Sequence, residues 1–227
     1  INEVYKIVRS MPNLRFVNLS ENDLSKCKYT AESLNTEQHR LESIKSLVLN
    51  NTRIPWPAVQ LLLNLMPSIV DLHLSLNNYS SIELSPAIHS YPSIKYLYLS
   101  GNPDLCNWDD VVLLLQTFSD LEGLTMADCN FDSIPEDVMP FLGNLISFNI
   151  SNWPIKSWEC IDRLSQLPKL VKLWCQGIHV LHRLESSDMR RQHLIARLPQ
   201  IQRLNGGDIT NDERVFAERA FIRWFIS

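Results

Sequence analysis

The 227-residue sequence predicts an α/β solenoid, in which a parallel sheet forms the concave side and helices form the convex side. Three observations support this prediction. A short leucine-containing phrase recurs along the chain, its copies start 24–31 residues apart, and helical patterns lie between several of the copies. Units of this size are too small to bury an apolar face alone, so they must stack to form a continuous core.

The repeated phrase reads L-x-x-L-x-L-x-x-N-x-L, and its first copy runs from Leu14 to Leu24. This phrase, with a period of 24–31 residues, is typical of leucine-rich repeats. We therefore expect about seven repeats in a single domain over residues 1–227, curved like a horseshoe. The further copies start at Ile44, Ile69, Ile94, Leu121, Leu145, Leu170 and, in a degenerate form, Ile201.

Alternation within the phrase separates core positions from exposed positions. Successive side chains of a strand point to opposite faces, so Leu72 and Leu74 should face the core while Asp71 and His73 face outward. The same reading of the other copies gives the predicted concave surface. Its members are Phe16, Asn18, Ser46, Val48, Asp71, His73, Tyr96, Tyr98, Gly123, Thr125, Ser147, Asn149, Lys172 and Trp174.

A polar side chain just beyond each strand is expected to hydrogen-bond the backbone of the following turn. Asn22, Asn77 and Asn102 occupy this ladder position, and Thr52 and Cys129 substitute for asparagine in two other copies. Trp153 and Ile178 occupy it in the last two copies, and neither is a replacement for asparagine. We therefore expect the ladder to loosen toward the C-terminal repeats.

Three segments between strands share a helical stripe that begins with tryptophan. Trp56, Trp108 and Trp158 are each followed by apolar residues at steps of three, which places all of them on one helical face. A tryptophan at this spacing could also form a binding site, but its recurrence at matching positions favours a core role. The prolines that follow these and later helices end them before the next strand: Pro67, Pro168 and Pro199.

The two ends of the stack differ. Residues 198–227 read as a C-terminal cap, with Thr210 and Glu213 spaced as a capping box before a helix from Val215 to about Phe225. Apolar side chains of that helix should cover the last repeat, namely Phe216, Phe221, Ile222 and Phe225. Residues 1–11 read as the convex helix of an earlier repeat, so we expect the chain to be a piece of a longer protein.

Composition and charge exclude several functional classes. The chain is 45% hydrophobic with a net charge of −4 and only six glycines, which disfavours nucleic-acid binding through a basic surface and glycine-rich phosphate loops. No apolar run is long enough to span a membrane. An odd cysteine count of five favours a reducing compartment. We therefore expect a cytoplasmic protein with no nucleic-acid or membrane partner.

The charge is unevenly distributed along the chain. Residues 67–162 hold 2 basic and 13 acidic side chains, whereas residues 163–227 hold 11 basic and 6 acidic ones. Residues 1–66, with 8 basic and 6 acidic side chains, are closer to neutral. The electrostatic field of such a charge distribution can orient a charged partner. An equal alternative is that the charges only form a solvated surface that keeps the protein in solution.

Neither a metal site nor a catalytic site is expected. Cys175, His179 and His182 lie close in sequence, but no fourth zinc ligand accompanies them. Asp71, His73 and Ser75 share one face of a strand in an order that suggests a triad. A straight strand keeps such neighbours about 6.5–7 Å apart, which is too far for the hydrogen bonds that nucleophilic catalysis requires. We expect no enzyme activity and no cofactor.

Several runs resemble one family. They are residues 47–52, residues 76–79, Ser157-Trp158-Glu159 with Ile161, Asp162 and Leu164, residues 194–199, residues 204–206 and Glu218-Arg219 with Phe221, Ile222 and Arg223. Over essentially the whole chain the sequence is similar to the tubulin-folding cofactor E family, and the cofactor E-like branch fits best.

The resemblance implies an intracellular, cytoskeleton-associated protein that binds α-tubulin or the tubulin heterodimer and takes part in its folding, dissociation or destabilisation. It implies other tubulin-folding cofactors as further partners. In the family a ubiquitin-like domain follows the repeats and, in cofactor E itself, a CAP-Gly domain precedes them. Neither flank is present in this chain, so activities that depend on the flanks cannot be assigned to these residues.

Strand alternation, and not the resemblance, selects the residues expected to bind a partner. They are Phe16, Val48, Asp71, His73, Tyr96, Tyr98, Thr125, Asn149, Lys172 and Trp174. Exposed Tyr and Trp are over-represented among residues that dominate binding energy. The alternative is that these aromatic side chains only shield neighbouring strands. The alternative function is a scaffold for another intracellular complex, such as a phosphatase regulator or a splicing-type subunit.

Overall fold

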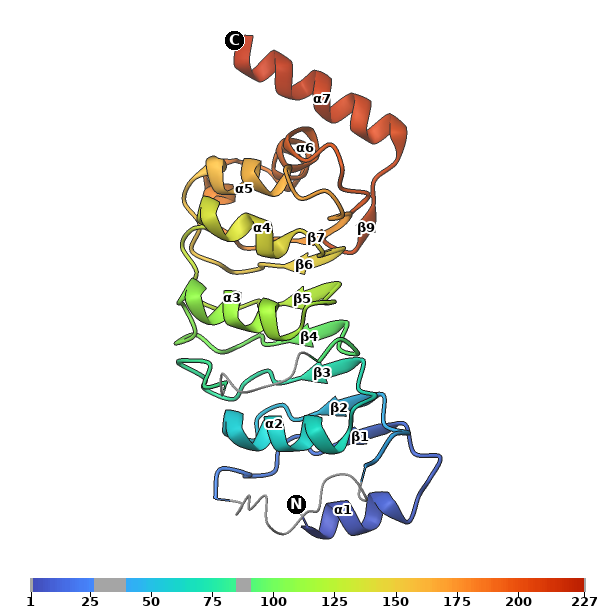
Figure 1. Ribbon diagram of the computed structural model, residues 1–227. Helices are drawn as coiled ribbons and strands as arrows, with labels where there is room; N and C mark the ends of the chain where they lie inside the picture. Colours follow the sequence, from blue (N-terminus) through green and yellow to red (C-terminus); the bar gives the residue numbers. More distant parts are fainter. Residues whose placement is uncertain (1, 27–39, 85–90, 227) are drawn as a thin grey trace. The chain divides into compact units, whose positions relative to one another are not determined.

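A computed structural model describes residues 2–26, 40–84 and 91–226, and two compact units are present in it (Figure 1). The N-terminal unit comprises Ile1–Leu121 and the C-terminal unit comprises Glu122–Ser227. The single domain over residues 1–227 and its horseshoe curvature therefore remain predictions.

In the described part of the N-terminal unit, four strands pair in parallel and in register. Phe16, Ser46, Asp71 and Tyr96 are aligned across them as the first residue of each strand. The elements of this unit are α1 (Asn2–Arg9), β1 (Phe16–Asn18), β2 (Ser46–Val48), α2 (Trp56–Leu65), β3 (Asp71–His73), β4 (Tyr96–Tyr98) and α3 (Trp108–Thr117). The helix predicted within residues 1–11 is thus confirmed as α1.

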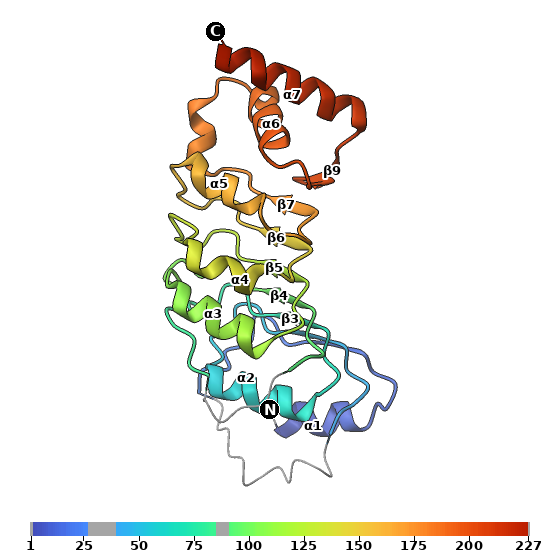
Figure 2. The ribbon, with the colours of Figure 1, turned by 45° about the horizontal axis from the view of Figure 1, so that its top comes forward.

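The C-terminal unit continues the same pattern and ends in a helical cap. Strands β5 to β8 pair in parallel, whereas β9 pairs antiparallel with β8. Helices α4 and α5 lie to one side of β6 and β7 in both views (Figures 1 and 2). The elements are β5 (Gly123–Thr125), η2 (Glu136–Val138), α4 (Met139–Leu142), β6 (Ser147–Asn149), α5 (Trp158–Leu164), β7 (Lys172–Trp174), η3 (His179–Arg183), α6 (Ser187–Arg197), β8 (Arg203–Leu204), β9 (Gly207–Asp208) and α7 (Asn211–Ile226).

The predicted alternation is confirmed at the centre of every three-residue strand, where a buried apolar side chain faces the core. Two outward positions differ from the prediction. Val48 is only 7% exposed, because its short side chain lies in register between Asn18 and His73. Gly123 is also buried, since it has no side chain to project. The buried centres are Val17, Leu47, Leu72, Leu97, Leu124, Phe148 and Leu173.

A left-handed residue lies immediately before each ladder position. The φ angles of these seven residues are between 53° and 70°, a region that strains most side chains. Glycine occupies two of the seven positions, and at Gly101 an added Cβ would lie 2.4 Å from Cδ2 of Leu76, so that side chain would have to move. The chain therefore bends away from each strand at one fixed place. The seven residues are Glu21, Asn51, Leu76, Gly101, Asp128, Asn152 and Gly177.

The asparagine ladder is present in the N-terminal unit as predicted. The side chain of Asn102 is fully buried, and its Oδ1 accepts from the backbone N–H of Asn77 at 3.0 Å and of Tyr79 at 3.2 Å. Its Nδ2 donates to the carbonyls of Leu99 and Leu74, at 2.7 and 3.3 Å. One buried amide thus joins its own turn to the preceding repeat.

The expectation that the ladder loosens at Trp153 is wrong in one respect. The indole Nε1 of Trp153 donates to the carbonyl of Met126 at 2.6 Å. Met126 is the residue of the preceding repeat that corresponds to Leu74, the acceptor of Asn102. A tryptophan therefore replaces the donor half of the asparagine, although it has no acceptor oxygen. Ile178 is buried at the next ladder position and has neither group.

The tryptophans that begin the convex helices are partly buried to different degrees. Trp56 is 3% exposed, which confirms its core role. Trp108 and Trp158 are half-buried. The ring of Trp158 lies beneath the guanidinium of Arg197, with 4.6 Å between the guanidinium carbon and the ring centroid. This tryptophan therefore connects α5 to α6 rather than filling the core.

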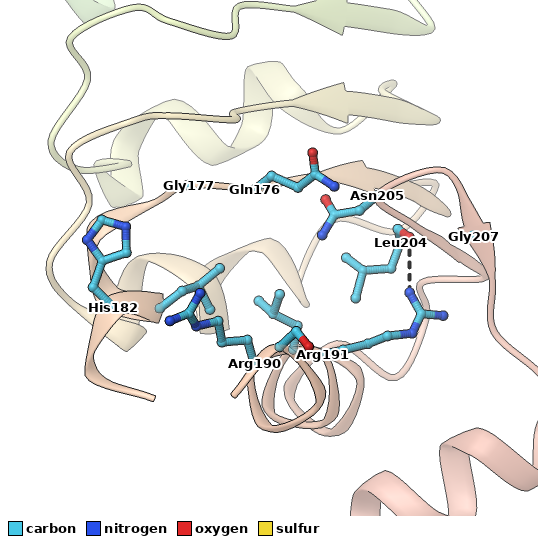
Figure 3. A pocket seen from close by; sticks show the side chains of 11 residues that line it. Gln176, Gly177, His182, Arg190, Arg191, Leu204, Asn205 and Gly207 are labelled. Carbon is cyan, nitrogen blue, oxygen red and sulfur yellow. Dashed lines mark hydrogen bonds between the residues drawn. The ribbon is translucent and has the colours of Figure 1, made fainter. Parts of the chain in front are cut away.

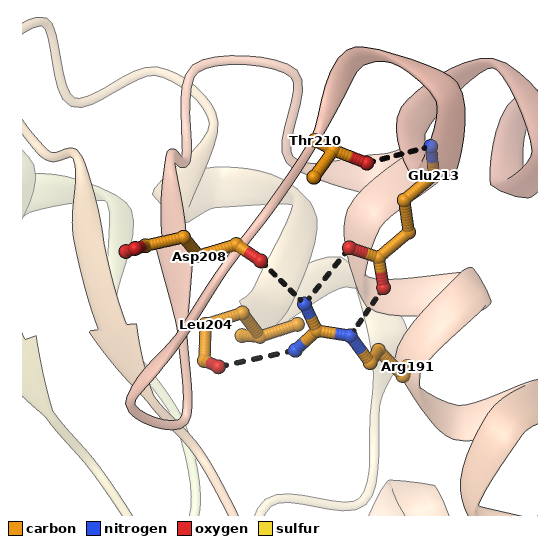
Figure 4. A network of polar contacts seen from close by, with 5 residues as sticks. All are labelled: Arg191, Leu204, Asp208, Thr210 and Glu213. Carbon is orange, nitrogen blue, oxygen red and sulfur yellow. Dashed lines mark hydrogen bonds and ion pairs between the residues drawn. The ribbon is translucent and has the colours of Figure 1, made fainter.

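The C-terminal cap begins with half of the predicted capping box. The hydroxyl of Thr210 accepts from the backbone N–H of Glu213 at 3.2 Å (Figure 4). The carboxylate of Glu213 does not return to Thr210 but binds Arg191 of α6. Side-chain charge, not the reciprocal box, therefore fixes the start of α7.

Helix α7 packs on α6 through fewer apolar side chains than predicted. Ala217 is fully buried and Phe221 is half-buried, whereas Phe216 and Ile222 are both 57% exposed. The prediction that Phe216 and Ile222 cover the last repeat is therefore wrong. The side chain of Phe225 lies outside the described residues. Phe216 and Ile222 stay exposed because a single helix can turn only one face toward α6.

An aromatic cluster at the cap contains a buried histidine. His193 is 5% exposed, and its ring centroid lies 4.9 Å from that of Trp224 and 5.3 Å from that of Phe221, both edge-on. Among the described residues, no hydrogen bond satisfies its Nδ1. Burial lowers the pKa of His193, and the nearby Arg197 lowers it further. Protonation of His193 thus opposes folding.

We expect the protein to lose stability as the pH falls below about 6.5, the ordinary pKa of histidine. The folded pKa of His193 is depressed, so the unfolded chain binds the proton more readily and stability is full only above that pH. The melting temperature measured at pH 7.5 and 5.5 should fall less for His193→Gln than for the wild type. His73, whose pKa is also lowered, remains in both proteins and serves as the internal reference. An equal fall in both would contradict this role of His193.

Candidate functional site

The outer face of β1 to β4 presents two rows of side chains. The first row aligns Phe16, Ser46, Asp71 and Tyr96, with Phe16 55% exposed and Tyr96 37% exposed. Neighbouring strands are about 4.8 Å apart, so residues at the same register lie side by side. Aromatic rings therefore stand at both ends of a row whose centre is polar.

The second row contains a stacked pair of rings. His73 and Tyr98 lie with centroids 4.1 Å apart and an interplanar angle of 5°. Burial lowers the pKa of His73, and Asp71 opposes this shift. Burial, followed by the charge of Asp71, raises the pKa of Tyr98. Both rings are consequently uncharged near neutral pH, and they form a flat platform beside Tyr96.

The outer face of β5 to β8 is different in character. Lys172 is exposed and aligns with Ser147 and Arg203, while Trp174 is half-buried and aligns with Asn149. The side-chain oxygen of Asn149 accepts from the backbone of Ser151 at 3.0 Å, so it serves the turn. Thr125 aligns with Asn149 and is half-buried. This face therefore combines the positive charge of Lys172 with the aromatic ring of Trp174.

Arg203 was missed among the predicted binding residues. It aligns with Lys172, and its guanidinium forms an exposed ion pair with Asp208 at 3.4 Å. Its Nε also donates to the carbonyl of Gly206. Arg203 immediately precedes Leu204 of the degenerate last copy, so the same alternation would have identified it.

The structure does not assemble the catalytic or metal arrangements considered from sequence. Across residues 2–26, 40–84 and 91–226, no hydrogen bond joins His73 to Asp71 or Ser75, and the ring of His73 stacks on Tyr98 instead. No cluster of metal-binding side chains occurs among the described residues. Burial raises the pKa of the Cys175 thiol to about 12, which disfavours the thiolate that zinc requires.

The described helices include α2, α3, α5, α6 and α7. None of those within the described ranges combines the length and apolarity that a membrane crossing requires.

Comparison with known proteins places the chain among its relatives. No protein-family model matches it. It is 34% identical over 228 residues to the human tubulin-specific chaperone cofactor E-like protein, which covers 99% of the chain and 52% of that protein. The predicted resemblance to the tubulin-folding cofactor E family is thereby confirmed. Mouse tubulin-specific chaperone E is 27% identical over 251 residues, which covers 97% of the chain and 46% of that protein.

The chain spans about half the length of these curated relatives of the cofactor E family. Solved structures agree on its fold. Human 5T4, the trophoblast glycoprotein, matches with a TM-score of 0.59 at 21% identity. The match covers 86% of the present chain and 70% of the 5T4 chain. A leucine-rich-repeat protein of Leptospira interrogans matches with a TM-score of 0.54 at 16% identity. The match covers 93% of the present chain and 54% of the Leptospira chain. The leucine-rich-repeat fold is confirmed.

Proposed function

We propose that this chain is a non-enzymatic interaction domain that binds tubulin, through the α subunit, as part of tubulin folding or heterodimer dissociation. The names of its relatives, tubulin-specific chaperone cofactor E-like protein and tubulin-specific chaperone E, support the choice of partner. On this proposal the chain acts in the cytoplasm on the cytoskeleton, and other tubulin-folding cofactors are further partners.

The observation that carries the proposal is the aromatic face of the N-terminal unit. Phe16 and Tyr96 are exposed. The rings of His73 and Tyr98, on the neighbouring strands β3 and β4, stack on each other in the same sheet. Large rings lose little conformational entropy on binding and remove much apolar surface from water. Val48 is buried, so it helps to shape this face but offers a partner little contact area. Asp71 supplies the polar contact at the centre of this face.

We expect Phe16→Ala and Tyr98→Ala to weaken binding of the purified tubulin heterodimer by about thirtyfold each, the effect of losing about 2 kcal/mol at a binding hot spot. Phe216→Ala is the matched control, because Phe216 of α7 is 57% exposed and Phe16 is 55% exposed. Affinity is measured by biolayer interferometry, and the melting temperature of each variant is measured in parallel. Equal affinity for wild type and folded Phe16→Ala would reject the aromatic face.

The face of the C-terminal unit is tested separately with Trp174→Ala and Lys172→Gln. Loss of affinity only in these variants would move the binding surface to that unit, where Thr125 and Asn149 also lie. A pull-down from cell lysate compares tubulin with other partners. Recovery of a phosphatase catalytic subunit or an RNA-containing complex in place of tubulin would favour the alternative scaffold function.

A further inference from the structure

A cavity of about 400 Å³ opens within the C-terminal unit, at the junction of the last repeat and its cap (Figure 3). It lies between the turn after β7, η3, α6 and the β8–β9 hairpin. The phrase copies at Leu170 and Ile201 are 31 residues apart, whereas those at Leu121, Leu145 and Leu170 are 24 and 25 apart. The longer step between Leu170 and Ile201 contains η3 and α6, and both elements line the cavity.

The floor of the cavity is apolar. Leu181, Leu194 and Leu204 line it, and each is 5% exposed or less. They come from η3, α6 and β8, so three separate elements fix the shape of the floor. A cavity of this size and lining accommodates one apolar side chain of a ligand.

Hydrogen-bond donors surround that floor. The Oδ1 of Asn205 accepts from the backbone N–H of Cys175 at 2.8 Å, which turns its amide nitrogen toward the cavity (Figure 3). The Nε of Arg190 donates to the carbonyl of Leu184 at 3.1 Å, so the guanidinium is held beside His182. Gln176 lies across the cavity from Arg190.

The two arginines of the cavity differ in their availability. Arg191 is occupied by Glu213 and by the carbonyls of Leu204 and Asp208. For Arg190, by contrast, no ion pair with a carboxylate occurs within the part of the chain that the structure describes. The described lining residues include no Asp or Glu. The positive charge of Arg190 is therefore balanced by no carboxylate in the cavity lining.

We propose that this cavity binds an acidic peptide, with one apolar side chain on the leucine floor and a carboxylate on Arg190. Charge complementarity supports this occupant, since residues 163–227 carry 11 basic and 6 acidic side chains. An apolar floor below a cationic rim fits an acidic residue next to a leucine or phenylalanine better than a free inorganic anion. The cavity is separate from the two sheet faces, so this inference is independent of the proposed function.

The probe is a fluorescein-labelled peptide of sequence Glu-Glu-Leu-Glu-Glu, and its binding to the intact chain is followed by fluorescence anisotropy. Arg190→Gln should weaken binding about tenfold, because glutamine removes the charge-assisted hydrogen bond to the peptide carboxylate. Arg219→Gln changes the net charge equally on the exposed surface of α7 and should change affinity less than about twofold. His182→Ala gives a second test if Arg190→Gln lowers the melting temperature.

A peptide with alanine in place of its leucine should bind more weakly than the parent, since it leaves the floor uncovered. Equal losses for Arg190→Gln and Arg219→Gln would show attraction to the basic surface in general and would overturn the proposal. The absence of peptide binding would also overturn it. A phosphoserine peptide that binds more tightly and does not need the leucine would replace it with a phosphate site. None of these results bears on tubulin binding by the sheet faces.

Discussion

Asn102→Ala should lower the free energy of unfolding by about 3–5 kcal/mol, a large effect for one polar substitution. The fully buried side chain makes four hydrogen bonds to backbone groups of two repeats. Alanine replaces none of them, so the backbone groups of Asn77, Tyr79, Leu74 and Leu99 lose these partners. Each buried polar group that loses its partner costs about 1–3 kcal/mol.

Asn22→Ala is the matched control for this prediction, since Asn22 occupies the same ladder position in the first repeat. Its side chain is exposed and, among the described residues, donates to the carbonyls of Leu19 and Ser20. Its loss should cost less than about 1 kcal/mol, because water replaces both bonds. Urea unfolding of the two variants measures the difference. Similar costs at the two positions would show that burial of the ladder does not set its energy.

In the ladder, some features follow from the sequence pattern and others depend on side-chain packing. The position of Asn102 follows from the phrase alone, because the spacing after the strand fixes where its amide lies. The role of Trp153 does not follow, since its indole N–H meets the carbonyl of Met126 only through a particular side-chain orientation. Position within a repeat was therefore predictable, whereas the substitution of one donor for another depended on packing.

The candidate site divides in the same way. Alternation placed Phe16, Tyr96 and Tyr98 on the outer face correctly, because the side-chain period of a strand is two. It assigned Val48 to the exposed surface wrongly, since exposure also depends on the length of the side chains in neighbouring strands. The cavity beside Arg190 had no signal in the sequence apart from the 31-residue step, because its residues come from four separate segments.

Arg191→Met should lower the free energy of unfolding of the cap by about 2–3 kcal/mol. The guanidinium of Arg191 joins α6 to the start of α7 and to the β8–β9 segment, with Nε 2.5 Å from Glu213 and Nη1 3.1 Å from the carbonyl of Leu204 (Figure 4). Methionine retains much of the aliphatic packing but none of these bonds. Hydrogen exchange of α7 and tryptophan fluorescence, to which Trp224 contributes, measure release of the cap.

Arg203→Met separates this network from an ordinary surface ion pair. Arg203 lies on strand β8, and its ion pair with Asp208 is exposed, so loss of this ion pair should cost less than about 1 kcal/mol.

The pH dependence of stability provides a second distinction between the two variants. The hydrogen bond from Arg191 lowers the pKa of Glu213, so this carboxylate stabilises the fold above its unfolded pKa and loses that contribution as the pH falls through the folded value. Arg191→Met should therefore flatten the acid limb of the stability curve, whereas Arg203→Met should leave it unchanged. An equal loss of stability in both variants would mean that the charge of the C-terminal unit, and not this network, holds α7 in place.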